Sequence, residues 1–182
     1  MIAHEILIGV TGGIAAYKTA GLVSQLVQSG AQVSVAMTDT ACQFVGPATF
    51  AALSGRPVAT AVVDSDRFPK GAHIELAERA ELLCVAPATA SFLAKTARGH
   101  ADDLLSTLYL CFTGPVLLAP AMNPDMWSKP AVQRNVRQLT DDGTQIIPPE
   151  EGWVSCGRTG PGRMAAPDQI QTRIEAALRA AQ

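Results

Sequence analysis

The sequence predicts a single-domain α/β fold in which helices cover both faces of a parallel sheet, and three observations predict it. Strand-like and helix-like segments alternate from the start of the chain to its end. The strand-like segments are continuous apolar runs, which is typical of strands buried on both faces. The 182 residues suit one domain and contain no internal repeat or interdomain linker. Because such alternation favours right-handed crossovers, we expect a three-layered, doubly wound, Rossmann-like sheet.

The apolar runs and the stretches between them predict each element in order. The strands are expected at EILIGV (5–10), AQVSVAM (31–37), ELLCVA (81–86), PVLLA (115–119) and, more weakly, TQIIP (144–148). The helices are expected near 14–29, 40–54, 73–80, 89–98, 102–113, 130–141 and 167–181. Two segments break the pattern, 62–72 and 149–166, and loops of that length are often functional lids.

The composition excludes several classes of protein. Only 16% of the residues are charged while 48% are hydrophobic, so we expect part of the surface to be covered by further copies of the chain. The net charge of −2 provides no basic surface for nucleic acid. No apolar run has the length of a membrane span and the N-terminus lacks a signal-peptide layout, which predicts a cytoplasmic protein.

The four cysteines do not have the spacing of a zinc site or of a disulfide framework. Cys42, Cys84 and Cys111 fall in helix-like or strand-like patterns, where a free cysteine usually packs as a small buried apolar residue. Cys156 differs, because it lies between Ser155 and Gly157 in a polar loop.

The segment TGGIAAYK (11–18) joins the first strand to the first helix. Gly12 and Gly13 allow the backbone to approach a ligand, and the helix N-terminus that follows favours an anion. The spacing matches neither a dinucleotide fingerprint nor a nucleoside-triphosphate loop, so a mononucleotide phosphate fits better. A tight turn without a ligand is the alternative.

Hydroxyl side chains follow the second strand. Thr38 and Thr40 flank Asp39, so the two hydroxyls could bind phosphate while the acid caps the next helix. The alternative is that all three residues cap that helix.

The segment APATAS (86–91) closes the third strand at the same edge of the sheet. Pro87 shapes the turn, Thr89 and Ser91 present hydroxyls, and the small residues leave room for a flat ring. An ordinary helix start would have a similar sequence.

The segment PAMNPDMW (120–127) follows a buried strand, and open α/β sheets bind ligands at the carboxyl ends of their strands. Asn123 offers a donor and an acceptor, and Pro120 and Pro124 stiffen the backbone around it. The arrangement suits recognition of a carboxylate or amide, although Asn123 could instead be an ordinary helix cap.

His73 begins a helix in the segment GAHIEL (71–76), directly after the long loop at 62–72. A single histidine at a helix start is more often structural than catalytic. Glu75 could orient its ring or cap the helix.

The loop at 149–166 combines mobile glycines with the Cys156 thiol and with Trp153 and Met164, which could grip an apolar ligand. Arg158 and Arg163 could hold an anionic substrate. These features predict a clamp that closes over a bound ligand and delivers a proton, and a plain surface loop is the alternative.

Taken together, TGGIAAYK, GAHIEL, APATAS, PAMNPDMW and SCGRTGPGRM resemble, in order and spacing, the motifs of the homo-oligomeric flavin-containing cysteine decarboxylases. The resemblance covers nearly the whole chain and implies the flavoprotein type of fold, an FMN cofactor and assembly as a trimer or dodecamer. It is strongest to members that act on 4′-phosphopantothenoylcysteine in coenzyme A biosynthesis. Many bacteria fuse that activity to a cysteine ligase. At 182 residues the chain resembles a free-standing decarboxylase with the ligase as a separate partner, and a piece of such a fused protein is the alternative.

The resemblance assigns roles by position. It implies catalytic roles for His73, Asn123 and Cys156. The implied FMN contacts are Gly12, Gly13, Ile14, Thr38, Thr40, Pro87, Thr89, Ala90, Ser91 and Met122. The implied substrate contacts are Ala121, Asn123, Val154, Ser155, Cys156 and Arg163. Many relatives have Asn where this chain has Ser91, so one flavin contact is expected to differ.

The implied chemistry is decarboxylation through thioaldehyde and enethiolate intermediates, with Asn123 holding the carboxylate and Cys156 returning a proton. A peptidyl-cysteine decarboxylase of lantibiotic maturation stops at the enethiol and does not need Cys156. Flavin prenyltransferases share the fold but lack these motifs. A non-catalytic flavin-binding regulatory subunit is the remaining alternative, and the presence of His73, Asn123 and Cys156 together disfavours it.

Overall fold

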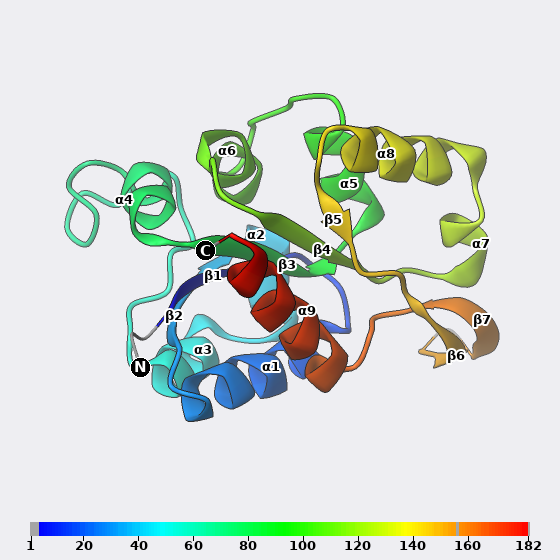
Figure 1. Ribbon diagram of the computed structural model, residues 1–182, viewed down its shortest axis with the longest axis horizontal. Helices are drawn as coiled ribbons and strands as arrows, with labels where there is room; N and C mark the ends of the chain where they lie inside the picture. The colour runs from blue at the N-terminus through cyan, green and yellow to red at the C-terminus, as the bar shows by residue number, and fades with distance from the viewer. Residues whose placement is uncertain (1–3, 156, 182) are drawn as a thin grey trace.

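The central sheet contains five parallel strands in the order β2-β1-β3-β4-β5 (Figure 1). The structure is a computed structural model that describes residues 4–155 and 157–181. The strands are β1 (Glu5–Val10), β2 (Gln32–Met37), β3 (Leu82–Ala88), β4 (Val116–Pro120) and β5 (Gln145–Ile146). The predicted parallel, doubly wound sheet is therefore confirmed.

Helices cover both faces of this sheet, which gives the three predicted layers (Figure 1). One face carries α1 (Ala16–Gln28), α2 (Asp39–Phe44), α3 (Pro47–Ser54) and α9 (Pro167–Ala180). The other carries α4 (Ala72–Arg79), α5 (Ala90–Thr96), α6 (Leu104–Cys111) and α8 (Pro130–Asp141). Side chains of β1 alternate between the two cores, because successive residues of a strand point to opposite faces: Ile6 and Ile8 enter one core and Leu7 the other.

The strand order places a switch point beside β1. The chain leaves β1 for β2 on one side and then returns to β3 on the other side of β1. Leu7 is in register with Ser34 of β2 and with Leu83 of β3. In open α/β sheets the crevice outside the carboxyl ends of such neighbouring strands is where ligands bind. The turns after β1 and β3 are therefore the first place to look for a site.

The single helix predicted at 40–54 is wrong, because the chain forms two helices there. α2 ends before Val45, which is extended, and α3 begins at Pro47 after Gly46. Proline lacks the backbone N–H that a continuous helix would need at this point, and it is well suited to the first turn of a new helix.

The segment predicted as a clamp loop at 149–166 is instead largely a hairpin. β6 (Glu150–Val154) and β7 (Arg158–Arg163) pair antiparallel and form a small second sheet beside the main one (Figure 1). A further short helix, α7 (Pro124–Trp127), follows β4 and contacts the hairpin.

The cysteines differ in their surroundings. Cys84 is fully buried in β3, and burial raises the pKa of its thiol to about 12. Cys42 is half-buried, whereas Cys111 is exposed at the end of α6, contrary to the predicted burial. Cys156 lies outside the described residues. Among the helices in the described part of the chain, none is long and apolar enough to cross a membrane.

Candidate active site

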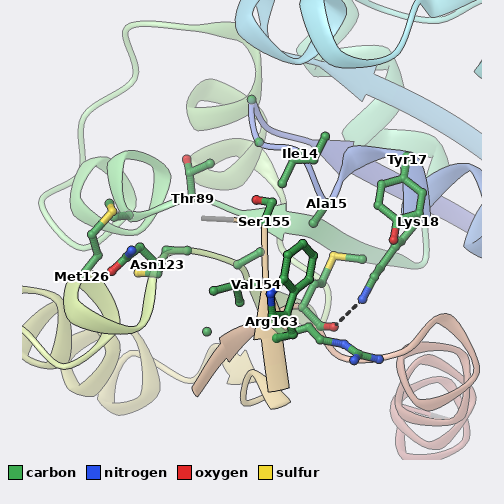
Figure 2. Close-up of a pocket in the computed structure, with 18 residues that line it drawn as sticks. Ile14, Ala15, Tyr17, Lys18, Thr89, Asn123, Met126, Val154, Ser155 and Arg163 are labelled. Carbon is green, nitrogen blue, oxygen red and sulfur yellow. Dashed lines mark hydrogen bonds between the residues drawn. The ribbon is translucent and has the colours of Figure 1, made fainter. Parts of the chain in front are cut away.

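A cavity of about 670 Å³ opens at the carboxyl edge of the main sheet, and its volume is typical of small-molecule sites (Figure 2). Its walls come from the turn after β1, the start of α5, the segment between β4 and α7, and the hairpin. The lining residues are Gly12, Gly13, Ile14, Ala15, Tyr17, Lys18, Thr89, Ala90, Ala121, Met122, Asn123, Met126, Trp153, Val154, Ser155, Gly162, Arg163 and Met164.

The two turns at the switch point are tied together by Thr11. Its hydroxyl donates to the carbonyl of Pro87 at 2.6 Å and accepts the backbone N–H of Thr89 at 3.1 Å. In the first turn of α1, the Thr19 hydroxyl donates to the carbonyl of Ala86 at 2.7 Å. Since Thr11 and Thr19 are both buried, these bonds hold the turns after β1 and β3 in one geometry relative to each other.

Of the two glycines of the first turn, Gly12 is required by a close contact, whereas Gly13 has room for a Cβ. A Cβ on Gly12 would lie 2.4 Å from Cγ2 of Thr40, so only glycine allows the turn to pack there. A Cβ on Gly13 would lie 3.8 Å from Cγ2 of Thr89, in the space between the β1 and β3 turns. Together with the small residues Ala90 and Ala121 in the walls, the turn leaves room for a flat group bearing a phosphate.

Several predicted cofactor residues lie outside the cavity lining. Thr38 caps α2 by accepting the N–H of Ala41 at 3.2 Å, and Thr40 packs beneath Gly12. The cap is thus Thr38 and not Asp39, which lies in the first turn of α2. Pro87 is buried within β3 and Ser91 is exposed on α5.

Asn123 lies in the cavity wall and also caps a helix, so the alternative interpretation as a cap is confirmed, while recognition of a carboxylate or amide stays a prediction. Its Oδ1 accepts the backbone N–H of Asp125 at 2.8 Å, at the start of α7. The cap fixes the plane of the amide group, and Pro124 directly behind it is buried. The side chain is therefore held in one orientation at the cavity surface.

The hairpin is fixed to the segment that carries Asn123. The N–H of Met122 donates to the carbonyl of Gly162 at 2.9 Å, and a Cβ on Gly162 would lie 2.3 Å from the Met122 carbonyl oxygen. Arg158, near the hairpin tip, forms an ion pair with Asp125 of α7. Arg158 is absent from the cavity lining, so Arg163 alone of the two predicted arginines faces the cavity.

His73 is not brought to this cavity within one chain. It lies in α4, at the opposite side of the molecule from the hairpin in Figure 1. Its Nδ1 is buried and has no hydrogen-bond partner among the described residues. Glu75 accepts the N–H of Lys70 at 2.8 Å, so it satisfies the backbone before the helix and does not orient the ring.

Lys18 and Tyr17 line the cavity and were not predicted as site residues, although both belong to TGGIAAYK. The Lys18 ammonium group donates to the carbonyl of Met164 at 3.3 Å. Burial lowers its pKa, and the positive charge of Arg163 lowers it further, while Glu150 opposes the shift. No group of His, Cys, Asp or Glu that could hold a metal occurs within residues 4–155 and 157–181.

The chain belongs to the Flavoprotein family, whose sequence model matches residues 2–179. It is 48% identical over 167 residues to the coenzyme A biosynthesis bifunctional protein CoaBC of Bacillus subtilis, covering 92% of this chain and 41% of that protein. It is 45% identical to CoaBC of Vibrio vulnificus, covering 96% and 44% respectively. The chain thus spans less than half the length of these curated relatives.

Solved structures share the whole fold. The FMN-dependent cysteine decarboxylase SpaF superposes with a TM-score of 0.83 at 36% identity, covering 98% of this chain and 97% of SpaF. A PPC decarboxylase cysteine-to-serine mutant, complexed with pantothenoylaminoethenethiol, also has a TM-score of 0.83, at 27% identity and with 96% and 97% coverage.

Proposed function

We propose that this chain is an FMN-dependent decarboxylase that converts 4′-phosphopantothenoylcysteine to 4′-phosphopantetheine in coenzyme A biosynthesis. The identity of 45–48% to bifunctional CoaBC proteins over nearly the whole chain carries the proposal. The PPC decarboxylase that superposes on this fold supports the same substrate class. A cysteine ligase that supplies the substrate is the proposed partner, and the cytoplasmic location remains a prediction.

The residues present fit FMN, because the glycine turn and the small wall residues leave space for a flat, phosphate-bearing group. Backbone N–H groups of Gly12, Gly13 and Ile14 would hold its phosphate at the start of α1. Thr89, Ala90 and Met122 would line its ring system. When bound, FMN supplies a reversible two-electron acceptor for the substrate.

Asn123 would hold the substrate carboxylate, because its amide is fixed by the α7 cap. Loss of a hydride and the thiol proton converts the CH₂–SH group of the substrate to a thioaldehyde, which places the carboxylate β to a C=S bond. Departing CO₂ leaves its bonding electrons as an enethiolate. Return of the hydride to the sulfur-bearing carbon and of a proton to the former Cα gives the saturated thiol.

Cys156 is the proposed donor of that proton. It lies outside the described residues, and its role is supported by its neighbour Ser155, which lines the cavity.

The test is anaerobic incubation of the FMN-loaded protein with 4′-phosphopantothenoylcysteine, following CO₂ and the thiol product by mass spectrometry together with the flavin spectrum. We expect 4′-phosphopantetheine and no net flavin reduction. Cys156→Ser should accumulate the enethiol with reduced flavin, whereas Cys111→Ser, at an exposed thiol on α6, should behave like the parent. Undiminished saturated product from Cys156→Ser would remove the proton-donor role.

A cysteine decarboxylase with a different substrate is the second candidate, since identity to SpaF is 36% against 27% to the PPC decarboxylase. The same assay separates the two. Turnover of a cysteine-terminated peptide to the enethiol, with no turnover of 4′-phosphopantothenoylcysteine, would favour the second candidate.

We also propose a homo-oligomer, either a trimer or a dodecamer, in which a neighbouring subunit supplies His73. The support is that His73 is separated from the cavity within one chain, while Ile14, Tyr17, Met126 and Trp153 are exposed at its rim. Covering these side chains with another subunit would bury apolar surface and complete the site. The native mass of the FMN-loaded protein checks the assembly.

A further inference from the structure

The cavity has two chemically different ends. Figure 2 shows Asn123 and Met126 at one side and Lys18 and Arg163 at the other, with Val154 between them. Among the described residues that line the cavity, Lys18 and Arg163 are the only charged ones. All the positive charge in the lining is therefore at the end away from the amide that would hold the substrate carboxylate.

The two cations are held close together by the protein. The Lys18 ammonium group is anchored on the carbonyl of Met164, the residue next to Arg163. The Arg163 Nε lies 3.5 Å from Glu150, which also accepts the N–H of Ala166, so the carboxylate steadies the guanidinium from outside the cavity lining. Two cations and one carboxylate leave a net positive charge at this end, where an anion would relieve the repulsion.

We propose that Lys18 and Arg163 form a subsite for the phosphate monoester at the far end of the substrate, and so select the phosphorylated substrate over its unphosphorylated form. This inference rests on the proposed function. A phosphate monoester carries close to two negative charges near neutral pH. It suits the planar fork of arginine together with the compact charge of lysine. The apolar side chains of Val154 and Met164 would contact the arm between the two ends.

FMN is the other phosphate monoester in this site, and the geometry favours the substrate for this subsite. The glycine turn at Gly12 and Gly13 precedes α1 and offers its own N–H groups to a phosphate. Lys18 instead lies within α1, and its ammonium group is directed toward the hairpin, which is the element expected to close over the substrate.

The test compares 4′-phosphopantothenoylcysteine with pantothenoylcysteine as substrates of the FMN-loaded enzyme. For Lys18→Gln and Arg163→Gln we expect kcat/KM with the phosphorylated substrate to fall by about 10- to 100-fold, mainly through KM. The value with pantothenoylcysteine should stay within about twofold, so the preference for phosphate collapses. Lys18→Arg should retain part of the preference, and Arg137→Gln, at an exposed arginine on α8, should retain all of it.

Two further measurements identify the source of any phosphate effect. Flavin content should be unchanged in both variants, and calorimetric titration of inorganic phosphate into the FMN-loaded protein should show binding that both variants lose. Loss of FMN with an unchanged substrate preference would overturn the proposal, because the cations would then hold the flavin phosphate. Equal losses with both substrates, or accumulation of the enethiol by Lys18→Gln with its preference intact, would also overturn it.

The proposed function can fail separately. A parent enzyme that turns over neither substrate would refute the decarboxylase assignment itself. The phosphate titration would then still decide the subsite: binding that depends on Lys18 and Arg163 supports it, and the absence of such binding overturns it.

Discussion

The two edges of the parallel sheet use their charges in opposite ways. At the amino edge, Arg56 bonds both carboxylate oxygens of Glu5 at 2.6 and 2.9 Å and also reaches Gln32 and Ser34. Next to it, Glu81 accepts the backbone N–H of Glu5 and contacts His4. The charged groups at the amino edge therefore pair with one another.

The carboxyl edge differs, because Lys18 and Arg163 face a cavity whose described lining contains no carboxylate.

The difference separates stability from function within one sheet. Charges that pair with each other stabilise the fold and need no bound ligand to balance them. The carboxyl edge is held instead by backbone bonds and by glycines that permit close approach, such as Gly162 against Met122. Substitutions at the carboxyl edge should therefore affect catalysis first, and those at the amino edge should affect unfolding first.

The largest expected effect is that of Gly162→Ala at the carboxyl edge. The added Cβ would lie 2.3 Å from the Met122 carbonyl oxygen, so the hairpin must move away from the segment that carries Asn123. Because a displacement of about 1 Å can cost a hundredfold in rate, we expect kcat/KM to fall by at least about 100-fold. Steady-state kinetics on the FMN-loaded enzyme measures this.

The matched control is Gly21→Ala in α1, where no atom other than those of the adjacent residues and the helix's own backbone lies within 4 Å of the added Cβ. Alanine has a higher helix propensity than glycine. We therefore expect unchanged turnover and a free energy of unfolding higher by about 0.5–1 kcal/mol. Turnover by Gly162→Ala equal to that of the control would show that the hairpin does not depend on this contact.

The next largest effect is expected at the amino edge, for Glu5→Gln. The change leaves the Arg56 guanidinium without its carboxylate, and both side chains are less than a third exposed. We expect the free energy of unfolding to fall by about 1–3 kcal/mol, with kcat/KM within about twofold of the parent. Glu78→Gln, whose carboxylate is exposed and 3.9 Å from Lys70, should cost less than about 0.5 kcal/mol. A large loss of activity in Glu5→Gln would break the separation of the two edges.

The main sheet could be predicted from sequence because its signal is local. A buried parallel strand is a continuous apolar run, and runs such as 5–10 and 81–86 place β1 and β3 correctly. The hairpin was missed because glycines at 152, 160 and 162 lower strand propensity, and its pairing depends on contact with α7. The break between α2 and α3 did have a sequence signal, Gly46 followed by Pro47, but the helical pattern continues across it.

The part of the site that could be predicted is formed by the motifs that directly follow strands. Gly12, Thr89 and Asn123 do line one cavity, because parallel strands end at one edge of the sheet. Lys18 was missed because a lysine in the first turn of a helix is usually a solvated side chain. Its ammonium group gains a partner only from the position of Met164, which is distant in sequence. The separation of His73 from the cavity depends on where α4 packs, which no local pattern encodes.

The smallest effect, at the amino edge, is a change in acid sensitivity on Glu81→Gln. The backbone N–H of Glu5 lowers the pKa of the Glu81 carboxyl, and His4 lowers it further. A carboxylate with a lowered folded pKa stabilises the fold fully above its ordinary pKa, and this contribution disappears as the pH falls through the lowered value. Thermal unfolding from neutral pH to about pH 3 should therefore show a smaller loss of stability on acidification for Glu81→Gln than for the parent.

The control is His4→Ala. Because the Glu5 N–H is the larger cause of the lowered pKa, His4→Ala should reduce the loss of stability on acidification by less than Glu81→Gln does. Identical curves for the parent and Glu81→Gln would mean that this bond is not maintained in solution, and that the amino edge depends on Arg56 alone.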